Sequence, residues 1–378
     1  MRQLFERTNI GSLELDNRAV RSATWSGVGD ERGYVTDRAI QFYEELARGN
    51  IGLIVTGYQY VMTNGIQLPY MLGNYEDAQI EGLRRLAAAV HAEGGKIIPQ
   101  IVHAGFRANP KLFRDDDELW APSPIPHPET GTLSVEMNKS QIRQLVEAFA
   151  AAAKRAKEAG FDGVQLHAAH GYCLNQFLSP AWNRRGDSYG GDTKKRYRFL
   201  GEVLEATRGA VGGDFPILVK LNGHDFIERG LTPEETIHIA RRLVDDGIAA
   251  IEVSGGSASS PKHLLPARKD IRDEKQEAYL LDLAVAVKEA VSVPVITVGG
   301  IRSLKKINGI LSEGKADYVA MARPFIREPH LVKRWREGKT KPATCVSCNG
   351  CFETGLQGLG ISCKVDRKLK ELETRQST

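Results

Sequence analysis

The chain of 378 residues lacks any long hydrophobic run, and this absence excludes whole classes of protein. No segment reaches the ~18 consecutive apolar residues that a membrane helix requires. The first twenty residues, MRQLFERTNIGSLELDNRAV, lack the apolar stretch of a secretory signal peptide. We therefore expect no membrane association and a cytoplasmic location.

A strong excess of charge of one sign is also missing. The chain has 51 Lys and Arg residues against 47 Asp and Glu residues, and its net charge of +4 comes without a long basic run. A surplus so small and scattered does not favour nucleic acid as a partner. The hydrophobic share of 42% and the charged share of 26% predict a globular protein with an ample core.

Short apolar runs alternate with longer segments of helical period. The segment between the third and fourth runs begins with a capping box of Asn138 and Gln141 and ends at Gly160. Eight strands with interleaved helices predict a closed parallel (β/α)8 barrel, an α/β fold, ahead of an open doubly wound sheet. The eight expected strands are 18–24, 51–57, 96–103, 163–168, 216–222, 248–255, 293–300 and 316–322.

Two regions fall outside this alternation. Residues 104–138 are too long and proline-rich for a plain connection, so we expect a cap over one end of the barrel. Residues 338–378 follow the eighth repeat and hold four of the five cysteines. The expected organisation is a barrel over residues 1–337 and a cysteine-rich extension over residues 338–378.

The fourth expected strand ends in chemically unusual residues, His167 and His170, followed by Tyr172. Functional side chains of such barrels gather at the carboxyl ends of strands. Positions i and i+3 of a continuing strand face opposite ways, so the two histidines converge only if the chain turns, which Gly171 permits. The pair alone leaves three interpretations open: a zinc site, satisfied structural imidazoles, or two donors to a ligand oxygen with Tyr172 as proton source.

The surrounding sequence adds a family resemblance. The stretch GFDGVQLHAAHGYCLNQFLSPAWNRRGDSYGG resembles the signature of the Old Yellow Enzyme family of FMN-dependent oxidoreductases. NRAVRSAT, PQIVHAG, ITVGG and MARPFIREP agree with that family at the first, third, seventh and eighth expected strands. The resemblance covers residues 1 to about 335 and implies FMN across the carboxyl-end mouth of the barrel.

The resemblance also implies which residues hold the cofactor. Gln100 would bind the pyrimidine edge of the flavin, and Lys220 would stabilise the anionic reduced flavin at N1 and O2. The residues assigned to the flavin ring are Ala23, Thr24, Gly57, Gln100, His167 and Lys220. Backbone amides and one guanidinium in the last two loops make the phosphate site typical of this barrel, from Gly299, Gly300, Ala322 and Arg323.

The reaction implied by the resemblance favours one of the three interpretations of the histidine pair, the two donors to a ligand oxygen. His167 and His170 would bind the carbonyl oxygen of an enone or enoyl thioester, while Tyr172 protonates the carbon α to that carbonyl. Hydride would pass from flavin N5 to the β carbon, with NAD(P)H as the reductant. A second reading is oxidation of a small methylated amine, for which the aromatic bowl would come from Trp25, Tyr58, Tyr60 and Trp182.

Four positions depart from the common family pattern. Trp25 stands where Cys or Thr is usual and would narrow the substrate pocket, to which Tyr58 also belongs. Lys220 replaces Arg and gives a point charge instead of a planar fork. Phe106 replaces the Arg of a typical HAGR, and Cys173 is interpreted as a small buried hydrophobe first and as a reactive thiol second.

The remaining cysteines form one cluster, with spacings of two, two and eleven intervening residues. Such clustering in a cytosolic chain suggests metal or redox chemistry more than disulfides. Four thiolates suit a [4Fe-4S] cluster, and structural zinc and unligated thiols are the alternatives. Resemblance to the branch of 2,4-dienoyl-CoA reductase and trimethylamine dehydrogenase favours iron; the expected ligands are Cys345, Cys348, Cys351 and Cys363.

No G-x-G-x-x-G follows an expected strand, so the sequence predicts no Rossmann site for FAD or NAD(P)H. Two routes for electrons stay open. Either NAD(P)H reduces FMN at the barrel mouth, or a separate electron-donor protein acts through the cluster, in which case the chain is a flavin and iron-sulfur subunit. The small-molecule substrate is unidentified at this level, and the resemblance also allows a homo-oligomer.

Overall fold

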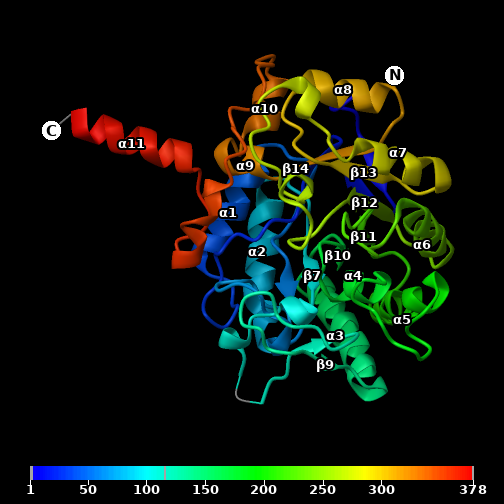
Figure 1. The fold of residues 1–378 in the computed structure, drawn as a ribbon. Coiled ribbons are helices and arrows are strands. Elements are labelled where there is room, and N and C mark those ends of the chain that lie inside the picture. The colour runs from blue at the N-terminus through cyan, green and yellow to red at the C-terminus, as the bar shows by residue number, and fades with distance from the viewer. Residues whose placement is uncertain (1–2, 115, 377–378) are drawn as a thin grey trace.

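Ten hydrogen-bonded strands, all parallel, form the central sheet of the computed structural model, which describes residues 3–114 and 116–376 (Figure 1). Most of them are buried along their whole length, as expected for a parallel sheet with helices outside and side chains inside. In spatial order they are β5 (Gln59–Tyr60), β7 (Gln100–Val102), β10 (Val164–Ala168), β11 (Ile217–Asn222), β12 (Ala250–Ser254), β13 (Val295–Val298), β14 (Tyr318–Met321), β3 (Ala19–Arg21), β4 (Leu53–Val55) and β6 (Ile97–Ile98).

Pro99 separates β6 from β7, and this single stretch of chain joins the two ends of the sheet. β6 pairs with β4 while β7 pairs with β10, so the strands close into a ring. Pro99 has no amide hydrogen to donate, but its carbonyl accepts from the Gln165 amide at 2.9 Å. The predicted (β/α)8 barrel is confirmed, and each of the eight expected ranges contains a strand.

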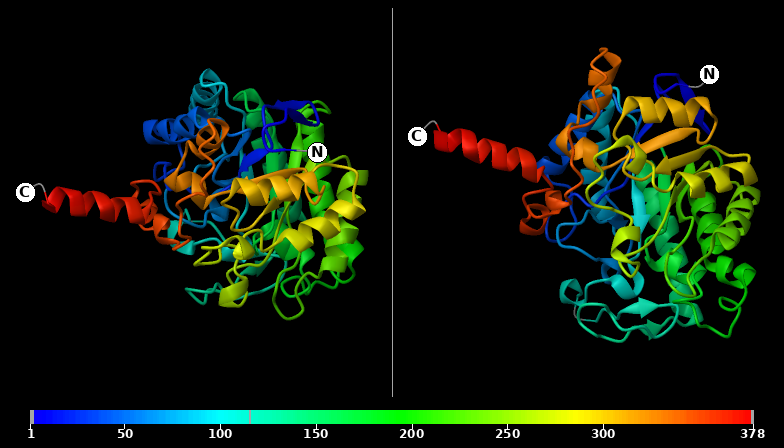
Figure 2. Two further views of the ribbon diagram at one scale, coloured as in Figure 1. Left: turned by 90° about the horizontal axis from the view of Figure 1, so that it is seen from above. Right: turned by 45° about the horizontal axis from the view of Figure 1, so that its top comes forward.

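Helices cover the outside of the barrel (Figure 2). Asn138 and Gln141 form the predicted capping box of α3, and Gly160, with φ of 86°, follows its C-cap. None of the described helices is both long and apolar enough to cross a membrane. The helices of the barrel are α1 (Asp37–Arg48), α2 (Ile80–Ala92), α3 (Lys139–Glu158), α4 (Cys173–Leu178), α5 (Thr193–Val211), α6 (Pro233–Asp245), α7 (Leu281–Ala290), α8 (Leu304–Ser312), α9 (Arg323–Arg327) and α10 (Leu331–Arg336).

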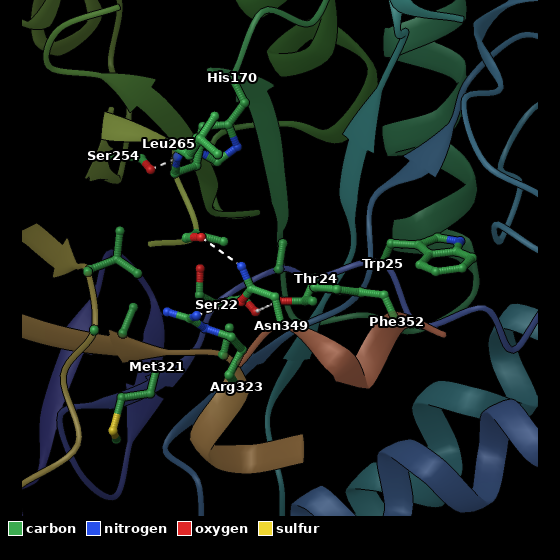
Figure 3. Close-up of a pocket in the computed structure, with 18 of the residues that line it drawn as sticks. Ser22, Thr24, Trp25, His170, Ser254, Leu265, Met321, Arg323, Asn349 and Phe352 are labelled. Carbon is green, nitrogen blue, oxygen red and sulfur yellow. Dashed lines mark hydrogen bonds between the residues drawn. The ribbon is translucent and has the colours of Figure 1, made fainter. Parts of the chain in front are cut away.

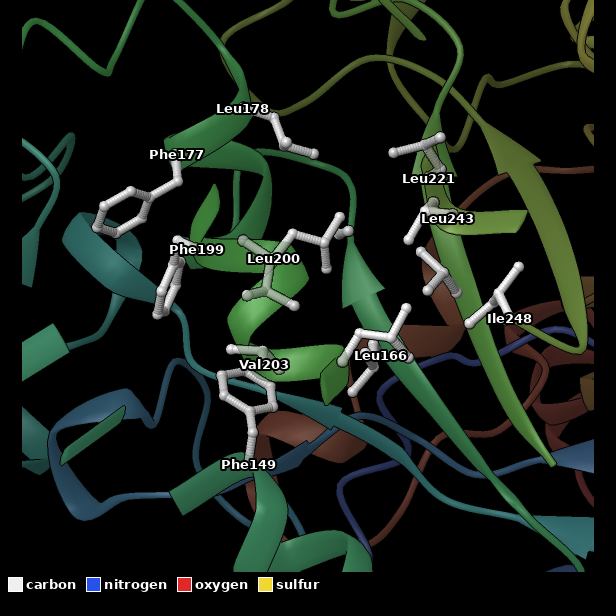
Figure 4. Packing of buried hydrophobic residues seen from close by; sticks show 14 of the residues in the cluster. Phe149, Leu166, Phe177, Leu178, Phe199, Leu200, Val203, Leu221, Leu243 and Ile248 are labelled. Carbon is white, nitrogen blue, oxygen red and sulfur yellow. The ribbon is translucent and has the colours of Figure 1, made fainter. Parts of the chain in front are cut away.

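The largest part of the core lies between the strands β10 and β11 and the helices α3 to α6 (Figure 4). Phe149 of α3 and Leu200 of α5 are completely buried there. The rings of Phe177 and Phe199 lie 4.3 Å apart between their centroids. This packing fixes α4 against β10, and α4 begins directly after the His167 to Tyr172 segment.

An antiparallel hairpin lies at the amino-terminal side of the barrel, formed by β1 (Thr8–Ile10) and β2 (Leu13–Leu15). Its apolar residues pack with inward residues of the barrel strands, including Val20 and Leu53. The hairpin therefore covers one end of the barrel with apolar side chains. The functional cavity lies at the other end of the strands.

Within the expected cap of residues 104–138, the described ranges 104–114 and 116–138 form a folded loop beside β7 and α4 (Figure 1). The loop contains η3 (Gly105–Arg107), η4 (Pro110–Leu112) and the short paired strands β8 (Trp120–Ala121) and β9 (Val135–Glu136). The ring of Phe106 packs on Trp182 at 5.9 Å, and the Trp120 ring stacks on His103 at 6.3 Å. These contacts fix η3 and therefore the direction of Arg107, its last residue.

The cysteine-rich extension lies against the barrel up to residue 363, and α11 (Lys364–Gln376) then projects away from the body (Figures 1 and 2). Phe352 stacks on Trp25 with ring centroids 6.4 Å apart. The Ile361 amide donates to the Ser26 carbonyl at 2.8 Å. The loop that follows β3 therefore joins the barrel to the extension.

Candidate active site

A cavity of about 530 Å³ opens where the strands of the barrel end at their carboxyl sides. Residues that follow β3, β10, β12, β13 and β14 line it, together with parts of the cap loop and of the extension. Its volume suits a cofactor or small ligand. Among the described residues, the lining contains four basic side chains and no Asp or Glu: Arg107, Lys220, Arg302 and Arg323.

The structure brings most of the predicted site residues to this one cavity. Those that line it are Ala23, Thr24, Trp25, Tyr58, His170, Tyr172, Lys220, Gly299, Gly300, Ala322 and Arg323. Gly57, Gln100 and His167 lie outside the lining, although all three are buried. Figure 3 shows His170 beside Ser254 at one side of the cavity and the stacked Trp25 and Phe352 at another.

The residues predicted to bind phosphate form one end of the cavity. Gly299 and Gly300 have φ values of 132° and 69°, which side-chain-bearing residues rarely adopt. A Cβ atom on Gly300 would lie 2.9 Å from the Tyr279 ring, so only glycine leaves this backbone accessible. The Arg323 guanidinium donates to Asn349 Oδ1 at 2.6 Å, and this bond orients it at the cavity wall. Open backbone and a fixed guanidinium fit a phosphate group.

Eleven buried side-chain polar atoms have no hydrogen-bond partner among the described residues, and two of the eleven belong to residues predicted to bind the flavin. These two are Gln100 Oε1 and His167 Nδ1, whose side chains are almost completely buried. The Nε2 atom of Gln100 donates to Gln165 Oε1 at 2.7 Å, and this bond fixes the orientation of the Gln100 amide. A buried polar atom without a partner is destabilising, and a bound polar ligand would satisfy these two. These residues fit the polar edge of a flavin.

Lys220 lies in the cavity wall, and its positive charge is paired with the buried carboxylate of Glu252. Its Nζ donates to Ser22 Oγ at 2.7 Å and to Glu252 Oε1 at 2.9 Å. Gln165 donates to the other carboxylate oxygen of Glu252 at 2.9 Å. Sequence reasoning missed Glu252, although a carboxylate inside the apolar strand IAAIEVSG is a signal of a buried ion pair.

The predicted turn after His167 is confirmed. His170 has a left-handed backbone with φ of 62°, and Gly171 follows with φ of 76°. The turn brings the His167 and His170 rings to 5.1 Å between centroids, nearly perpendicular. His170 Nε2 lies 2.7 Å from Ser254 Oγ. A left-handed non-glycine residue stores strain, and such residues cluster at functional sites.

Both imidazoles are neutral at ordinary pH. Burial, followed by the charges of His170 and Lys220, lowers the pKa of His167 well below its usual value. Burial, followed by the charges of Lys220 and Arg107, lowers the pKa of His170 in the same way. A neutral imidazole can donate one hydrogen bond without losing its proton, as a carbonyl-binding site requires.

The hydroxyl group of Tyr172 is hydrogen-bonded to Gln67, a residue that was not predicted from the sequence. The Tyr172 hydroxyl donates to Gln67 Oε1 at 2.6 Å, and the Tyr58 hydroxyl donates to the same atom at 3.1 Å. Burial raises the pKa of Tyr172, and the charge of Arg107 opposes this rise in part. The phenol is therefore protonated near neutral pH. Gln67 lies in a loop without periodic pattern, so no signal marked it.

Only two of the four aromatic residues expected for an amine-binding bowl line the cavity. Trp25 and Tyr58 line the cavity, but Tyr60 and Trp182 do not. The Tyr60 hydroxyl donates to the Arg32 carbonyl at 2.9 Å, and Trp182 packs on Phe106. The Trp25 indole, which donates to the Pro69 carbonyl at 3.1 Å, packs on the extension.

Three of the clustered cysteines share one loop, and the fourth returns beside them. Burial raises the pKa of Cys351 to about 11, and the nearby thiols of Cys345 and Cys348 add to this effect. The Ser362 amide, next to Cys363, donates to the Cys351 carbonyl at 3.2 Å. Cysteines on two neighbouring segments are the donor type that an iron-sulfur cluster or a structural zinc ion would use.

The arrangement of the thiol side chains supports neither a bound cluster nor a bound zinc ion. Within the described part of the chain, no three or more His, Cys, Asp or Glu side chains are arranged to hold a metal ion. Cys173 is fully buried and its pKa is raised by burial, which agrees with its interpretation as a small buried hydrophobe.

Comparisons with known proteins agree with the geometry. A sequence model of the NADH:flavin oxidoreductase / NADH oxidase family matches residues 3–341. The NADH oxidase of Thermoanaerobacter brockii is 38% identical over 368 residues, which are 96% of this chain and 56% of that protein. The NADPH dehydrogenase of Geobacillus sp. (strain WCH70) is 34% identical over 354 residues, which are 93% of this chain and 98% of that protein.

A solved structure extends the likeness to three dimensions. The complex of 2-naphthoyl-CoA reductase with 2-naphthoyl-CoA aligns with a TM-score of 0.88 and 30% sequence identity. The alignment covers 96% of this chain and 56% of that one. The chain therefore spans about half the length of this protein and of the Thermoanaerobacter relative.

Proposed function

The chain belongs to the NADH:flavin oxidoreductase / NADH oxidase family, and from this premise we propose that it is an FMN-dependent ene-reductase. The proposal rests on one observation above the others. Two neutral imidazoles and one protonated phenol converge at the carboxyl ends of the barrel strands, beside a cavity of cofactor size. Hydrogen-bond donors and a proton donor are what reduction of an activated alkene requires from the protein.

The residues proposed to hold FMN fall into two groups. The ring group is Ala23, Thr24, Gly57, Gln100, His167 and Lys220, and the phosphate group is Gly299, Gly300, Ala322 and Arg323. When bound, FMN supplies the hydride that reaches the β carbon of the alkene. The Lys220 cation, balanced by Glu252, would stabilise negative charge at the pyrimidine side of the ring.

The substrate would bind through its carbonyl oxygen. His167 and His170 donate to that oxygen, which withdraws electron density from the alkene and makes the β carbon electrophilic. Tyr172 then gives its proton to the α carbon, and solvent returns a proton to the phenol. The net change is one hydride and one proton added to the double bond, while NAD(P)H is oxidised to NAD(P)+. The substrate class is an enone or an enoyl thioester.

Amine oxidation is the weaker reading of the same cavity. A methylated ammonium ion prefers aromatic faces or carboxylates. Two of the four bowl candidates lie outside the cavity, and the described lining holds basic side chains without any Asp or Glu. The described part of the lining therefore offers a cationic substrate no carboxylate partner, which favours the ene-reductase.

We also propose that Cys345, Cys348, Cys351 and Cys363 hold a [4Fe-4S] cluster. The support is the donor set, with three thiols on one loop and the fourth beside Cys351. The loop adjoins the flavin cavity, because Cys345 lines it and Arg323 binds Asn349. Iron and acid-labile sulfide, assayed on anaerobically purified protein, would be present in a ratio near one, and zinc would be absent.

Isotope labelling tests the proposed reaction. FMN-loaded protein receives 2-cyclohexen-1-one and NADPH carrying deuterium at C4, in ordinary water. We expect deuterium at the β carbon of the product, and deuterium at the α carbon when unlabelled NADPH is used in D2O. Absence of reduced product with both NADPH and NADH, although the flavin is reduced, would contradict the proposal.

A further inference from the structure

Arg107 is the cation of the cavity lining that lacks a partner. Its guanidinium makes no hydrogen bond and no ion pair with any residue of the ranges 3–114 and 116–376. The other three basic residues of the lining are occupied. Lys220 pairs with Glu252, Arg302 donates to two backbone carbonyls, and Arg323 donates to Asn349.

The position of Arg107 is on the substrate side of the cavity. A Cβ atom on Gly171 would lie 3.5 Å from Arg107 Cδ, so the aliphatic stem passes close to Gly171, the residue between His170 and Tyr172 in the sequence. The Arg107 charge lowers the pKa of both His170 and Tyr172 in part, which means that the guanidinium lies within electrostatic reach of the two groups. The phosphate-binding residues belong to different loops, after β13 and β14.

An unpaired guanidinium in a cavity can bind an anionic group of a ligand. Arg presents a planar fork of N–H donors that matches a carboxylate in a bidentate manner. No Asp or Glu among the described residues of the lining competes for it. The fold also holds it in place, because Gly105 to Arg107 form one turn whose Phe106 ring packs on Trp182.

We propose that Arg107 binds a carboxylate on the substrate itself, so that the preferred substrate is an activated alkene bearing a carboxylate in addition to its activating carbonyl. This inference rests on the proposed ene-reductase function and narrows its substrate class. The carboxylate must belong to the reacting skeleton, because Arg107 packs beside the groups that would act on the alkene. The phosphates of a coenzyme A thioester are separated from the alkene by the whole pantetheine arm.

The experiment compares two substrates that differ in one charge. The pair is (E)-4-oxopent-2-enoate and its methyl ester, reduced by the FMN-loaded protein under anaerobic conditions. We expect the wild-type protein to prefer the acid in kcat/KM. Arg107→Gln should lower the acid-over-ester ratio by about tenfold or more, mainly through KM of the acid, because a charge-assisted bidentate contact is lost. Arg107→Lys should restore part of the ratio.

Binding without turnover gives a second readout. The saturated acid 4-oxopentanoate is titrated into the oxidised FMN-loaded protein, and its dissociation constant is followed by the flavin absorbance. Arg107→Gln should raise this constant by about tenfold or more. The matched control is Arg114→Gln in the same cap loop, whose guanidinium contacts Tyr75 and does not line the cavity. It should leave the constant unchanged.

The outcomes separate the inference from the function on which it rests. If the wild-type protein reduces neither the acid nor the ester, the ene-reductase itself is contradicted. If it reduces the ester with an unchanged acid-over-ester ratio in Arg107→Gln, the carboxylate site is wrong and the function stands. If Arg107→Gln instead raises KM for NADPH over NADH, or for an enoyl-CoA over the acid, Arg107 binds a phosphate and the inference is overturned.

Discussion

The hydroxyl group of Tyr172 lies 2.6 Å from Oε1 of Gln67, to which it donates its proton in a hydrogen bond. Gln67 comes from the loop after β5, while Tyr172 follows β10, so the contact joins two sides of the cavity. Tyr58 donates to the same oxygen at 3.1 Å. One amide oxygen therefore fixes both phenols, and Gln67 is a positioning residue for the proposed proton donor.

Gln67→Leu tests this role. The change removes the acceptor and keeps a similar volume, so we expect reoxidation of the reduced flavin by an enone to slow by roughly tenfold, a fraction of what a positioned acid contributes. Reduction of the flavin by NADPH should keep its rate, because it needs no proton from Tyr172. Stopped-flow absorbance separates the two half-reactions. Equal slowing of both would point to a general structural defect.

We expect the buried ion pair of Lys220 and Glu252 to affect both the stability of the protein and the midpoint potential of bound FMN. Lys220→Met leaves the Glu252 carboxylate buried and unpaired, which should cost about 3–5 kcal/mol of the free energy of unfolding. Removing the cation should also lower the midpoint potential of bound FMN by roughly 30 mV or more, where 30 mV equals about 1.4 kcal/mol for two electrons. Urea denaturation and anaerobic dye titration measure the two effects.

The double variant Lys220→Met with Glu252→Gln is the control for that prediction. It should recover most of the stability, because no uncompensated carboxylate is left. The potential should recover in part, because the variant loses the negative charge of Glu252 together with the cation. A wild-type potential in both variants would remove Lys220 from the flavin site.

Because the imidazole of His103 is buried, we expect the free energy of unfolding to fall in acid. Its Nε2 lies 3.0 Å from Asn64 Oδ1, and the Gly105 amide donates to its Nδ1 at 3.0 Å. Burial lowers the pKa of His103 to about 3, below the usual value in an unfolded chain. The unfolded state therefore binds the extra proton, and stability falls as the pH falls from about 6.5 toward 3.

The slope of that loss is measurable by urea denaturation between pH 7 and pH 5. Each such histidine contributes up to about 1.4 kcal/mol per pH unit below pH 6. His103→Gln should reduce the slope by up to that amount. The control, His263→Gln, replaces an exposed imidazole and should leave the slope as it is. An unchanged slope in His103→Gln would show that burial does not keep this imidazole neutral.

Metal content tests the cysteine proposal. Cys351→Ser should lose most of the iron and sulfide, because Cys351 is the buried member of the loop and adjoins Cys363. Cys173→Ala is the matched control, since this cysteine is buried in the core and lies outside the cluster. Iron retained at the wild-type level in Cys351→Ser would contradict the ligand assignment.

The sequence predicted the barrel well because apolar runs and helix caps are local signals. The strand around Leu166 and the capping box of Asn138 needed no knowledge of distant residues. The histidine pair was also visible, because His167 and His170 interrupt an apolar strand end and Gly171 follows.

The partners of these residues could not be predicted in the same way. Gln67 and Arg107 lie on loops, where no period links a residue to its neighbours in space. The sequence suggested that Phe106 replaces the arginine of the family's HAGR motif and that this arginine is missing from the site. The turn from Gly105 instead directs Phe106 onto Trp182 and places the next residue, Arg107, at the cavity.

Anaerobic visible spectroscopy tests the central claim most directly. The purified protein, loaded with FMN, is mixed with NADPH or NADH and then with 2-cyclohexen-1-one. We predict that the nicotinamide bleaches the flavin bands and that the enone restores them, with one equivalent of saturated ketone per flavin. A flavin that is reduced but not reoxidised by any activated alkene would contradict the account, as would a protein that binds no FMN.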